Sequence, residues 1–189
     1  MNITTQWLQD KSACINGVIW FKKQSESNSM MILQLLIKQN KLDWANWLIV
    51  RLMNYKQAVS YAIYSAEQVI HIFERKHPND NRPRAAINAA KLCLKNPTKK
   101  NRADAYTATV NAYDAAAYTG AASDAAFAAN ASVAAACYDD FYVATDVAAD
   151  SAVDAYAYAA AYYDYFNAAR EQMRIKILKH GIILLKARG

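Results

Sequence analysis

The chain contains few of the residues that shape turn-rich or cross-linked proteins. Its 189 residues include only 4 Gly and 3 Pro. These are too few for a β protein with many tight turns, and they favour an all-α fold. The 3 Cys are Cys14, Cys93 and Cys137, and no two of them form a CxxC pair. We therefore expect no disulfide framework and a reducing, cytoplasmic location.

Long uncharged apolar runs are also missing, and we expect no secretory leader. No stretch reaches the roughly 18–20 apolar residues that a membrane-spanning helix requires, because Asp repeatedly interrupts the Ala-rich part of the sequence. Residues 1–25 have no basic start followed by an apolar centre, which is the pattern of a signal peptide. The sequence therefore predicts no membrane span.

Charge is divided unevenly along the chain. Residues 101–169 hold 28 Ala, 10 Tyr and 9 Asp, with no Lys, no Glu and a single Arg, Arg102. This segment has a formal charge of −8, so the remainder carries +14 in a chain whose net charge is +6. Such a division predicts an acidic surface and a basic one, and so concerns partners rather than chemistry.

Apolar residues recur at steps of three and four, the period of an amphipathic helix. Val59, Ile63 and Ile70 follow this period, which predicts a helix over 56–76 that ends before Pro78. The same reasoning predicts one or two helices over 3–25 around an Asn16-Gly17 turn, one over 29–38, one capped by Asp43 and one from Pro83 to about Leu94. Beyond residue 100 it predicts two or three helices that reach about His180. We expect these to break at Gly120 and near Thr145 or Ser151.

We therefore predict a single all-α domain over 1–189. It would comprise a basic helical half over 1–98, acidic Ala-rich helices over 99–180 and an apolar, basic tail over 181–189. Ala at helical spacing allows helices to approach closely, and Tyr can bridge them with its hydroxyl at the edge of the core. We expect Cys14, Cys93, Trp44 and Trp47 to be core residues.

A row of acidic residues is the first candidate site. Asp139, Asp146, Asp150 and Asp154 share a helix face with Tyr142 if one helix is continuous. Like charges at i, i+4 destabilise a helix by roughly 0.2–0.5 kcal/mol per pair, so helix stability does not explain the row. One interpretation is a solvated face that keeps an Ala-rich helix in solution. The other is a surface that docks a basic protein partner, with the carboxylates in the place of phosphates in its most specific version.

The loop that carries Asp80, Arg82, Pro83 and Arg84 is the second candidate. In the structural interpretation, Asp80 caps the following helix and the Arg side chains fix the loop by charged hydrogen bonds. In the functional interpretation, a helix N-terminus with two Arg residues binds an anion or a partner.

Catalytic and metal-binding patterns are weak. His71, His77 and His180 have no metal-ligand spacing, and His77 with Asp80 would be an acid–base pair without a nucleophile. The sequence has no glycine-rich phosphate loop and no HExxH motif. We expect no catalytic residues, no metal and no cofactor, and so no enzyme.

The C-terminal part alternates basic and apolar residues. One interpretation is a surface for membrane or nucleic acid. In the other, the apolar side docks on the domain and the basic side chains lie near the acidic helices or near helix C-termini. The basic residues are Arg170, Arg174, Lys176, Lys179, Lys186 and Arg188.

Three patterns in this sequence resemble those of a known family. Residues 13–20 have the form A-C-x-x-G-x-x-W, residues 43–48 the form D-W-x-x-W-L, and residues 80–90 the form D-x-R-P-R-x-A-I-x-A-A. With the Ala-rich helical part that follows, they resemble the all-α immunity proteins of bacterial polymorphic toxin systems over residues 13–175. The resemblance implies a non-catalytic protein that binds and neutralises a toxin or a nucleic-acid-processing complex.

Other functions remain open at this point. Related domains could be phage-encoded antagonists of a bacterial defence system such as CRISPR, acting by binding or by mimicry of nucleic acid. Opposite surface charges also allow a homodimer. The +14 remainder could instead bind nucleic acid directly, through Lys22, Lys23, Lys38, Lys41, Arg82, Arg84, Lys99 and Lys100.

Overall fold

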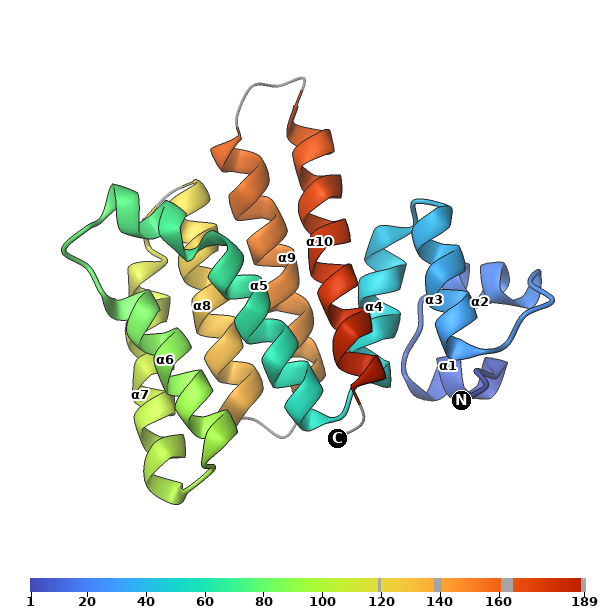
Figure 1. Cartoon of the computed structure of the whole chain (residues 1–189), viewed down its shortest axis with the longest axis horizontal. Coiled ribbons are helices and arrows are strands. Elements are labelled where there is room, and N and C mark those ends of the chain that lie inside the picture. Colours follow the sequence, from blue (N-terminus) through green and yellow to red (C-terminus); the bar gives the residue numbers. More distant parts are fainter. Residues whose placement is uncertain (119, 138–140, 161–164, 188–189) are drawn as a thin grey trace. The chain divides into compact units, whose positions relative to one another are not determined.

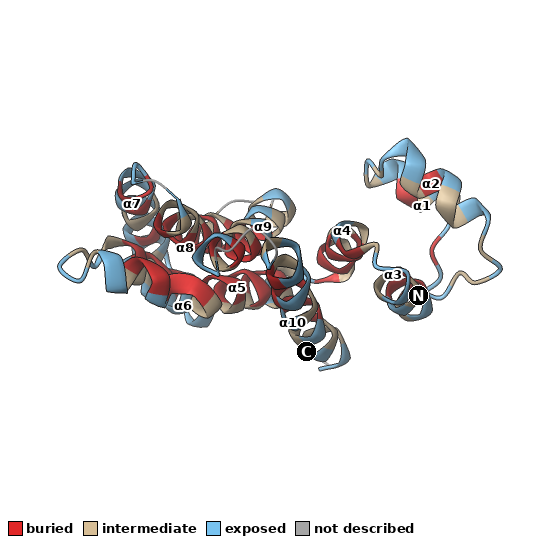
Figure 2. Ribbon diagram, turned by 90° about the horizontal axis from the view of Figure 1, so that it is seen from above, coloured by how far each residue is buried: buried red, intermediate tan, exposed pale blue. Residues whose placement is uncertain are grey.

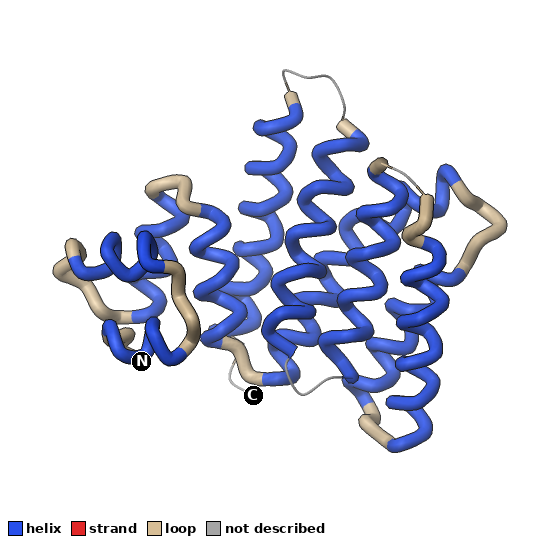
Figure 3. Tube along the Cα trace, turned by 180° about the vertical axis from the view of Figure 1, so that it is seen from behind, coloured by secondary structure: helices blue, strands red, loops and turns tan. Residues whose placement is uncertain are grey.

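The computed structural model of the chain describes residues 1–118, 120–137, 141–160 and 165–187 (Figure 1). These residues form ten α-helices and no strand. Figure 3 shows the helices in blue and the loops that join them in tan. An isolated antiparallel bridge joins Asn2 and Asn28. The all-α prediction is confirmed.

The chain divides into two compact units, Met1–Leu52 and Met53–Gly189. The change of composition at residue 98 therefore lies inside the second unit. That residues 1–189 form a single domain stays a prediction.

The first unit holds four short helices, α1 (Thr5–Asp10), α2 (Ile15–Lys22), α3 (Ser29–Lys38) and α4 (Leu42–Leu52). Side-chain hydrogen bonds cap the N-termini of three of these helices. The Thr4 hydroxyl accepts a hydrogen bond from the Trp7 N–H, and the Asn28 side chain accepts bonds from the first turn of α3. The Cys14 thiol accepts from the Gly17 N–H at 3.4 Å. Cys14 is exposed, so its placement in the core was wrong, whereas Cys93 is buried as expected.

Two boundaries in this unit differ from the prediction. Asn16 and Gly17 lie in the first turn of α2, and the break comes earlier, at Ser12, whose φ is 58°. Asp43 lies inside α4 and does not cap it, because the Ala45 N–H already bonds to the Lys41 carbonyl in the helical pattern. The preceding Asn40 has a φ of 54° and separates α3 from α4.

The second unit holds six longer helices in two layers, which Figure 2 shows from above. One layer contains α7, α8 and α9. The other contains α6, α5 and α10, with α5 on α8 and α9, α6 on α7 and α8, and α10 on α9. The bounds are α5 (Tyr55–Lys76), α6 (Arg82–Lys95), α7 (Lys99–Ala115), α8 (Ala121–Cys137), α9 (Phe141–Ala159) and α10 (Phe166–Lys186).

Alanine forms much of the core between these layers. In α8 the buried residues recur through the whole helix and are small, for example Ala125, Ala129 and Ser132. Small side chains let helix backbones approach closely, and the two largest fully buried side chains, Tyr61 and Phe73, come from α5. The buried Ser132 hydroxyl donates to the Ala129 carbonyl at 2.7 Å, so this polar group keeps a partner inside the core.

Some predicted boundaries of the Ala-rich part are confirmed and others are wrong. Gly120 has a φ of 69° and lies between α7 and α8, as expected. Thr145 and Ser151 lie inside α9, where the buried Thr145 hydroxyl donates to the Phe141 carbonyl at 2.7 Å. The last helix does not end at His180. Gly181 is buried in α10, which continues to Lys186 because its end packs on α5, where Gln57 donates to the Leu184 carbonyl at 2.8 Å.

Candidate functional site

The predicted acidic row lies on one continuous helix where it is described. Tyr142, Asp146, Asp150 and Asp154 belong to α9 and follow one another at steps of four. Asp139 lies outside the described residues. The condition for a shared face, an unbroken helix, is therefore met for the four described residues.

Two carboxylates of this row form ion pairs with α10. Arg174 contacts Asp150 at 2.5 Å, and Arg170 contacts Asp154 at 3.1 Å. Arg174 is only 3% exposed, so its charge is buried between helices. The expectation that basic residues of the last helix lie near the acidic helices is confirmed for Arg170 and Arg174.

These pairs change what the acidic row can do. Asp150 and Asp154 hold α10 against α9, and the paired Arg charges weaken their attraction for an external cation. Asp146 and Asp150 also lie close enough to the buried Tyr61 to add to the rise of its pKa, which burial mainly causes and which Arg174 opposes. Replacing Asp150 with Lys would place two cations together, so charge reversal of this row would disturb the fold as well as any docking.

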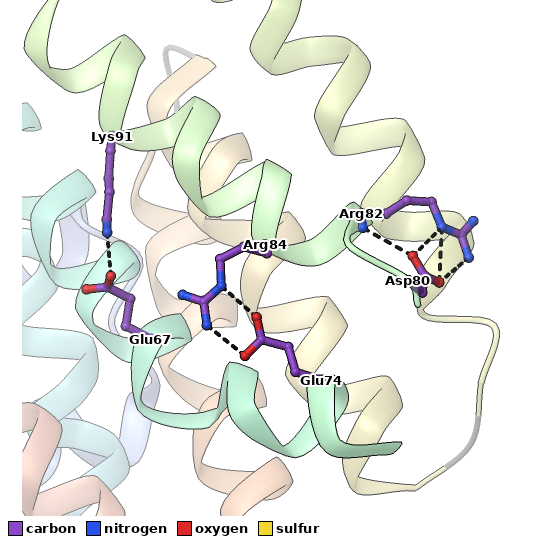
Figure 4. A network of polar contacts seen from close by, with 6 residues as sticks. All are labelled: Glu67, Glu74, Asp80, Arg82, Arg84 and Lys91. Atoms are coloured by element: carbon purple, nitrogen blue, oxygen red, sulfur yellow. Dashed lines mark hydrogen bonds and ion pairs between the residues drawn. The ribbon is translucent and has the colours of Figure 1, made fainter. Parts of the chain in front are cut away.

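The Asp80 loop is held by ion pairs of its own, which Figure 4 shows. Arg82 donates to the Asp80 carboxylate through its backbone N–H at 3.1 Å and through its guanidinium at 2.6–3.2 Å. Arg84 forms a two-bond contact with Glu74 of α5, at 2.7 and 2.8 Å. The hydrogen bonds from Arg82 and Arg84 lower the pKa of Asp80 and Glu74, respectively.

The loop geometry therefore favours the structural interpretation. The Arg84–Glu74 pair joins the start of α6 to the end of α5, and the Lys91–Glu67 pair at 2.5 Å joins the same helices two turns further along (Figure 4). Asn81 occupies the cap position of α6 without a side-chain bond to the helix. Both arginines that would hold an anion already face a carboxylate of the chain.

The histidines take part in ring packing. His77 stacks on Tyr118 with ring centroids 3.7 Å apart and also contacts Phe73. His180 stacks on Tyr64 at 3.7 Å, and burial lowers its pKa. In the described part of the chain, no group of three or more His, Cys, Asp or Glu residues could hold a metal ion.

A surface that the sequence did not single out lies on the layer of α7, α8 and α9. Tyr106, Val110 and Tyr113 follow at steps of four and three on α7, and they are 55%, 47% and 60% exposed. Val143 and Val147 are exposed on the face of α9 that carries Asp150 and Asp154. We call this surface the outer face, and define it by Tyr106, Val110, Tyr113, Asp124, Phe127, Val143, Val147, Asp150, Asp154 and Tyr158.

Contacts between neighbouring helices make the outer face continuous. Tyr113 of α7 meets Phe127 of α8 edge to face, with centroids 5.8 Å apart. Burial mainly raises the pKa of Asp124 on α8, and the negative charge of Asp154 on α9 adds to this rise. The two carboxylates therefore interact across the boundary between α8 and α9. Aromatic and valine side chains of α7, α8 and α9 thus share one surface with carboxylates of α8 and α9.

A signal for the outer face is present in the sequence. The step from Tyr106 to Val110 and Tyr113 is that of one helix face, but we assigned the tyrosines of this segment to the core. Ala fills the buried positions of α7, for example Ala105, Ala112 and Ala115. Since Ala is apolar too, the pattern does not show which apolar residues face inward.

Comparisons with models of known protein families, with curated proteins and with solved structures found no match to this chain. Among the described residues, every helix is too short or too polar to cross a membrane.

Proposed function

We propose that this chain is a non-catalytic, protein-binding inhibitor of the immunity type, which docks its outer face on a toxin or on a nucleic-acid-processing complex. The observation that carries the proposal is the exposure of Tyr106, Val110 and Tyr113 on one face of α7. Scattered exposed apolar residues are ordinary, whereas apolar residues gathered on one face mark an interaction surface. Tyrosine is also enriched at protein interfaces, since its ring packs and its hydroxyl remains hydrated.

The charge of the outer face supports a partner with basic groups among its contacts. Asp124, Asp150 and Asp154 lie between the apolar residues, and residues 101–169 include one Arg and no Lys. Complementary charge speeds encounter and selects partners more than it adds affinity. Because Arg170 and Arg174 already pair with two of these carboxylates, we expect apolar contacts to supply most of the affinity.

Antagonism of a bacterial defence system would use the same surface and differ only in the partner. Mimicry of nucleic acid is less well supported, since the ion pairs of Asp150 and Asp154 reduce the negative charge that a mimic would present. Direct binding of nucleic acid is weakened as well, because Arg82, Arg84 and Lys100 each pair with a carboxylate of the chain.

The test uses two double variants with the same change of charge. Val110→Lys with Val147→Lys places two cations on the outer face, at residues 47% and 42% exposed. Leu92→Lys with Ile183→Lys is the matched control on α6 and α10 of the other layer, at residues 48% and 63% exposed. Only the outer-face variant should lose the partner.

A further inference from the structure

The first unit contains a pocket of about 330 Å³ that the proposed function does not use. Buried aliphatic side chains, including Leu8, Ile32 and Leu36, form its floor. Trp20, Trp44 and Trp47 are half-buried and form its walls. Its volume lies at the lower end of the range for small-molecule sites, which is roughly 300–1,000 Å³.

Two of the sequence patterns described above meet at this pocket. From the first pattern, Ala13, Cys14, Gly17 and Trp20 line it. From the second, Asp43, Trp44, Trp47 and Leu48 line it. The first segment comprises α2 and the two residues before it, and the second lies in α4, so the fold brings two separate parts of the chain to one concave site.

The indole rings that line the pocket are held by contacts with one another and with residues outside the lining. The Trp20 ring N–H donates to the Gln39 side chain at 2.9 Å, and Trp20 meets Trp44 edge to face at 6.2 Å. Trp47 meets Trp7 in the same manner at 6.4 Å. Rings fixed in this way make a preformed site, which lowers the entropy cost of binding.

The lining selects for an uncharged ligand. Its one ionisable carboxylate, Asp43, is at an exposed position and would repel an anion. A ligand cation would be repelled by two cations that lie against rings of the pocket without lining it, Lys41 at 4.8 Å from the Trp44 ring centre and Arg51 at 4.3 Å from that of Trp47. Any charged group entering the apolar interior would also lose its hydration without a full replacement.

We propose that this pocket binds a neutral small molecule with one or two aromatic rings. Three indole rings and Phe21 offer edges and faces for stacked or edge-to-face contacts, which add to the burial of apolar area. A hydroxyl or amino group on the ligand can contact the polar atoms of Asp43, Ser12 and Cys14.

The full-length chain allows a direct test, because its 4 Trp all lie in the first unit. The probe is N-phenyl-1-naphthylamine, which is neutral and aromatic, and its matched control is 1-anilinonaphthalene-8-sulfonate, which adds one negative charge. We expect the neutral probe to quench tryptophan emission saturably, with one site per chain. The sulfonate should bind at least about tenfold more weakly.

Two variants test whether the neutral probe binds in this pocket. Ala13→Phe fills space at the pocket, and Ile15→Phe two residues later is its control, since Ile15 is 70% exposed and does not line the pocket. Ala13→Phe should weaken binding of the neutral probe by about tenfold or more, while Ile15→Phe leaves it unchanged. Circular dichroism verifies that both variants are folded.

A second readout needs no variant. Cys14 lines the pocket and is exposed, so the neutral probe should slow its alkylation by iodoacetamide in the unaltered protein. The proposal is overturned if the neutral probe gives no saturable quenching, if the sulfonate binds as tightly, if folded Ala13→Phe binds normally, or if Cys14 is not protected.

Discussion

Arg174 of α10 is 3% exposed and contacts the carboxylate of Asp150 on α9 at 2.5 Å, while the Asp150 side chain is 55% exposed. The pair thus joins a buried cation to a carboxylate that reaches solvent. An acidic residue that the sequence presents as a docking group therefore also stabilises the packing of two helices. One turn further along α9, Asp154 contacts Arg170 at 3.1 Å, and both of these side chains are partly exposed, at 38% and 41%.

This difference predicts unequal effects for two conservative variants. Asp150→Asn removes the negative charge that pairs with the buried Arg174 guanidinium. We expect this to lower the free energy of unfolding by about 1.5–3 kcal/mol. Asp154→Asn weakens an ion pair in which neither side chain is buried, and it should cost less than about 1 kcal/mol. Urea denaturation followed by circular dichroism measures both. Equal costs would contradict the stabilising role of the Arg174–Asp150 pair.

Gly120 predicts a second effect on stability. Its φ of 69° is in the left-handed region, and an added Cβ would meet no atom within 4 Å, so the cost of a side chain comes from the backbone alone. Gly120→Ala should therefore lower the free energy of unfolding by about 1–2 kcal/mol. Gly120→Asn should cost less, because Asn tolerates this conformation better. An Ala variant as stable as the unaltered protein would show that the loop adopts another backbone conformation.

The three cysteines should react with iodoacetamide at very different rates. Cys14 is exposed and Cys93 is buried. Burial, with a smaller contribution from Cys93, raises the pKa of Cys137 to about 11. Because the thiolate is the nucleophile, Cys137 should react slowly at pH 8 and about tenfold faster for each pH unit up to pH 10.

Mass spectrometry of peptides after timed alkylation follows each cysteine separately. Protein unfolded in urea is the control, in which all three should react readily. Reaction of Cys137 as fast as that of Cys14 at pH 8 in the folded protein would contradict the raised pKa.

Local signals predicted several elements well. The helix over 29–38 is observed as Ser29–Lys38, and the helix predicted over 56–76 is observed as Tyr55–Lys76. An apolar period, a capping residue and a following proline act within a few residues, so sequence alone shows them. The break at Gly120 is of the same kind, since it depends on one residue and its φ.

Tertiary contacts explain where those signals failed. Gly181 suggested the end of a helix, yet it is buried in α10, whose last turns pack on α5. Thr145 suggested a cap, yet its hydroxyl bonds within α9. For Gly181, contacts between helices far apart in sequence overrode a local preference. For Thr145, a hydrogen bond inside a continuous helix replaced the expected cap.

The candidate sites also combine residues that local sequence signals show with contacts that only the folded chain makes. The residues of the acidic row and of the Asp80 loop could be found from sequence, as could the position of Arg170 and Arg174 near the acidic helices. The individual pairs Arg174–Asp150, Arg170–Asp154 and Arg84–Glu74 could not. The two residues of each pair lie 10 to 24 positions apart and on different helices. The convergence of Trp20 and Trp44 on one pocket likewise requires the folded arrangement of α2 and α4.

The most direct test of the proposed function is capture of the partner from host lysate with three forms of the chain, read by mass spectrometry at low and moderate salt. The unaltered chain and the Leu92→Lys, Ile183→Lys control should retain one protein in stoichiometric amount. The Val110→Lys, Val147→Lys variant should lose that protein at both salt concentrations while remaining folded. Equal retention by the outer-face variant, or recovery of nucleic acid alone, would contradict the account.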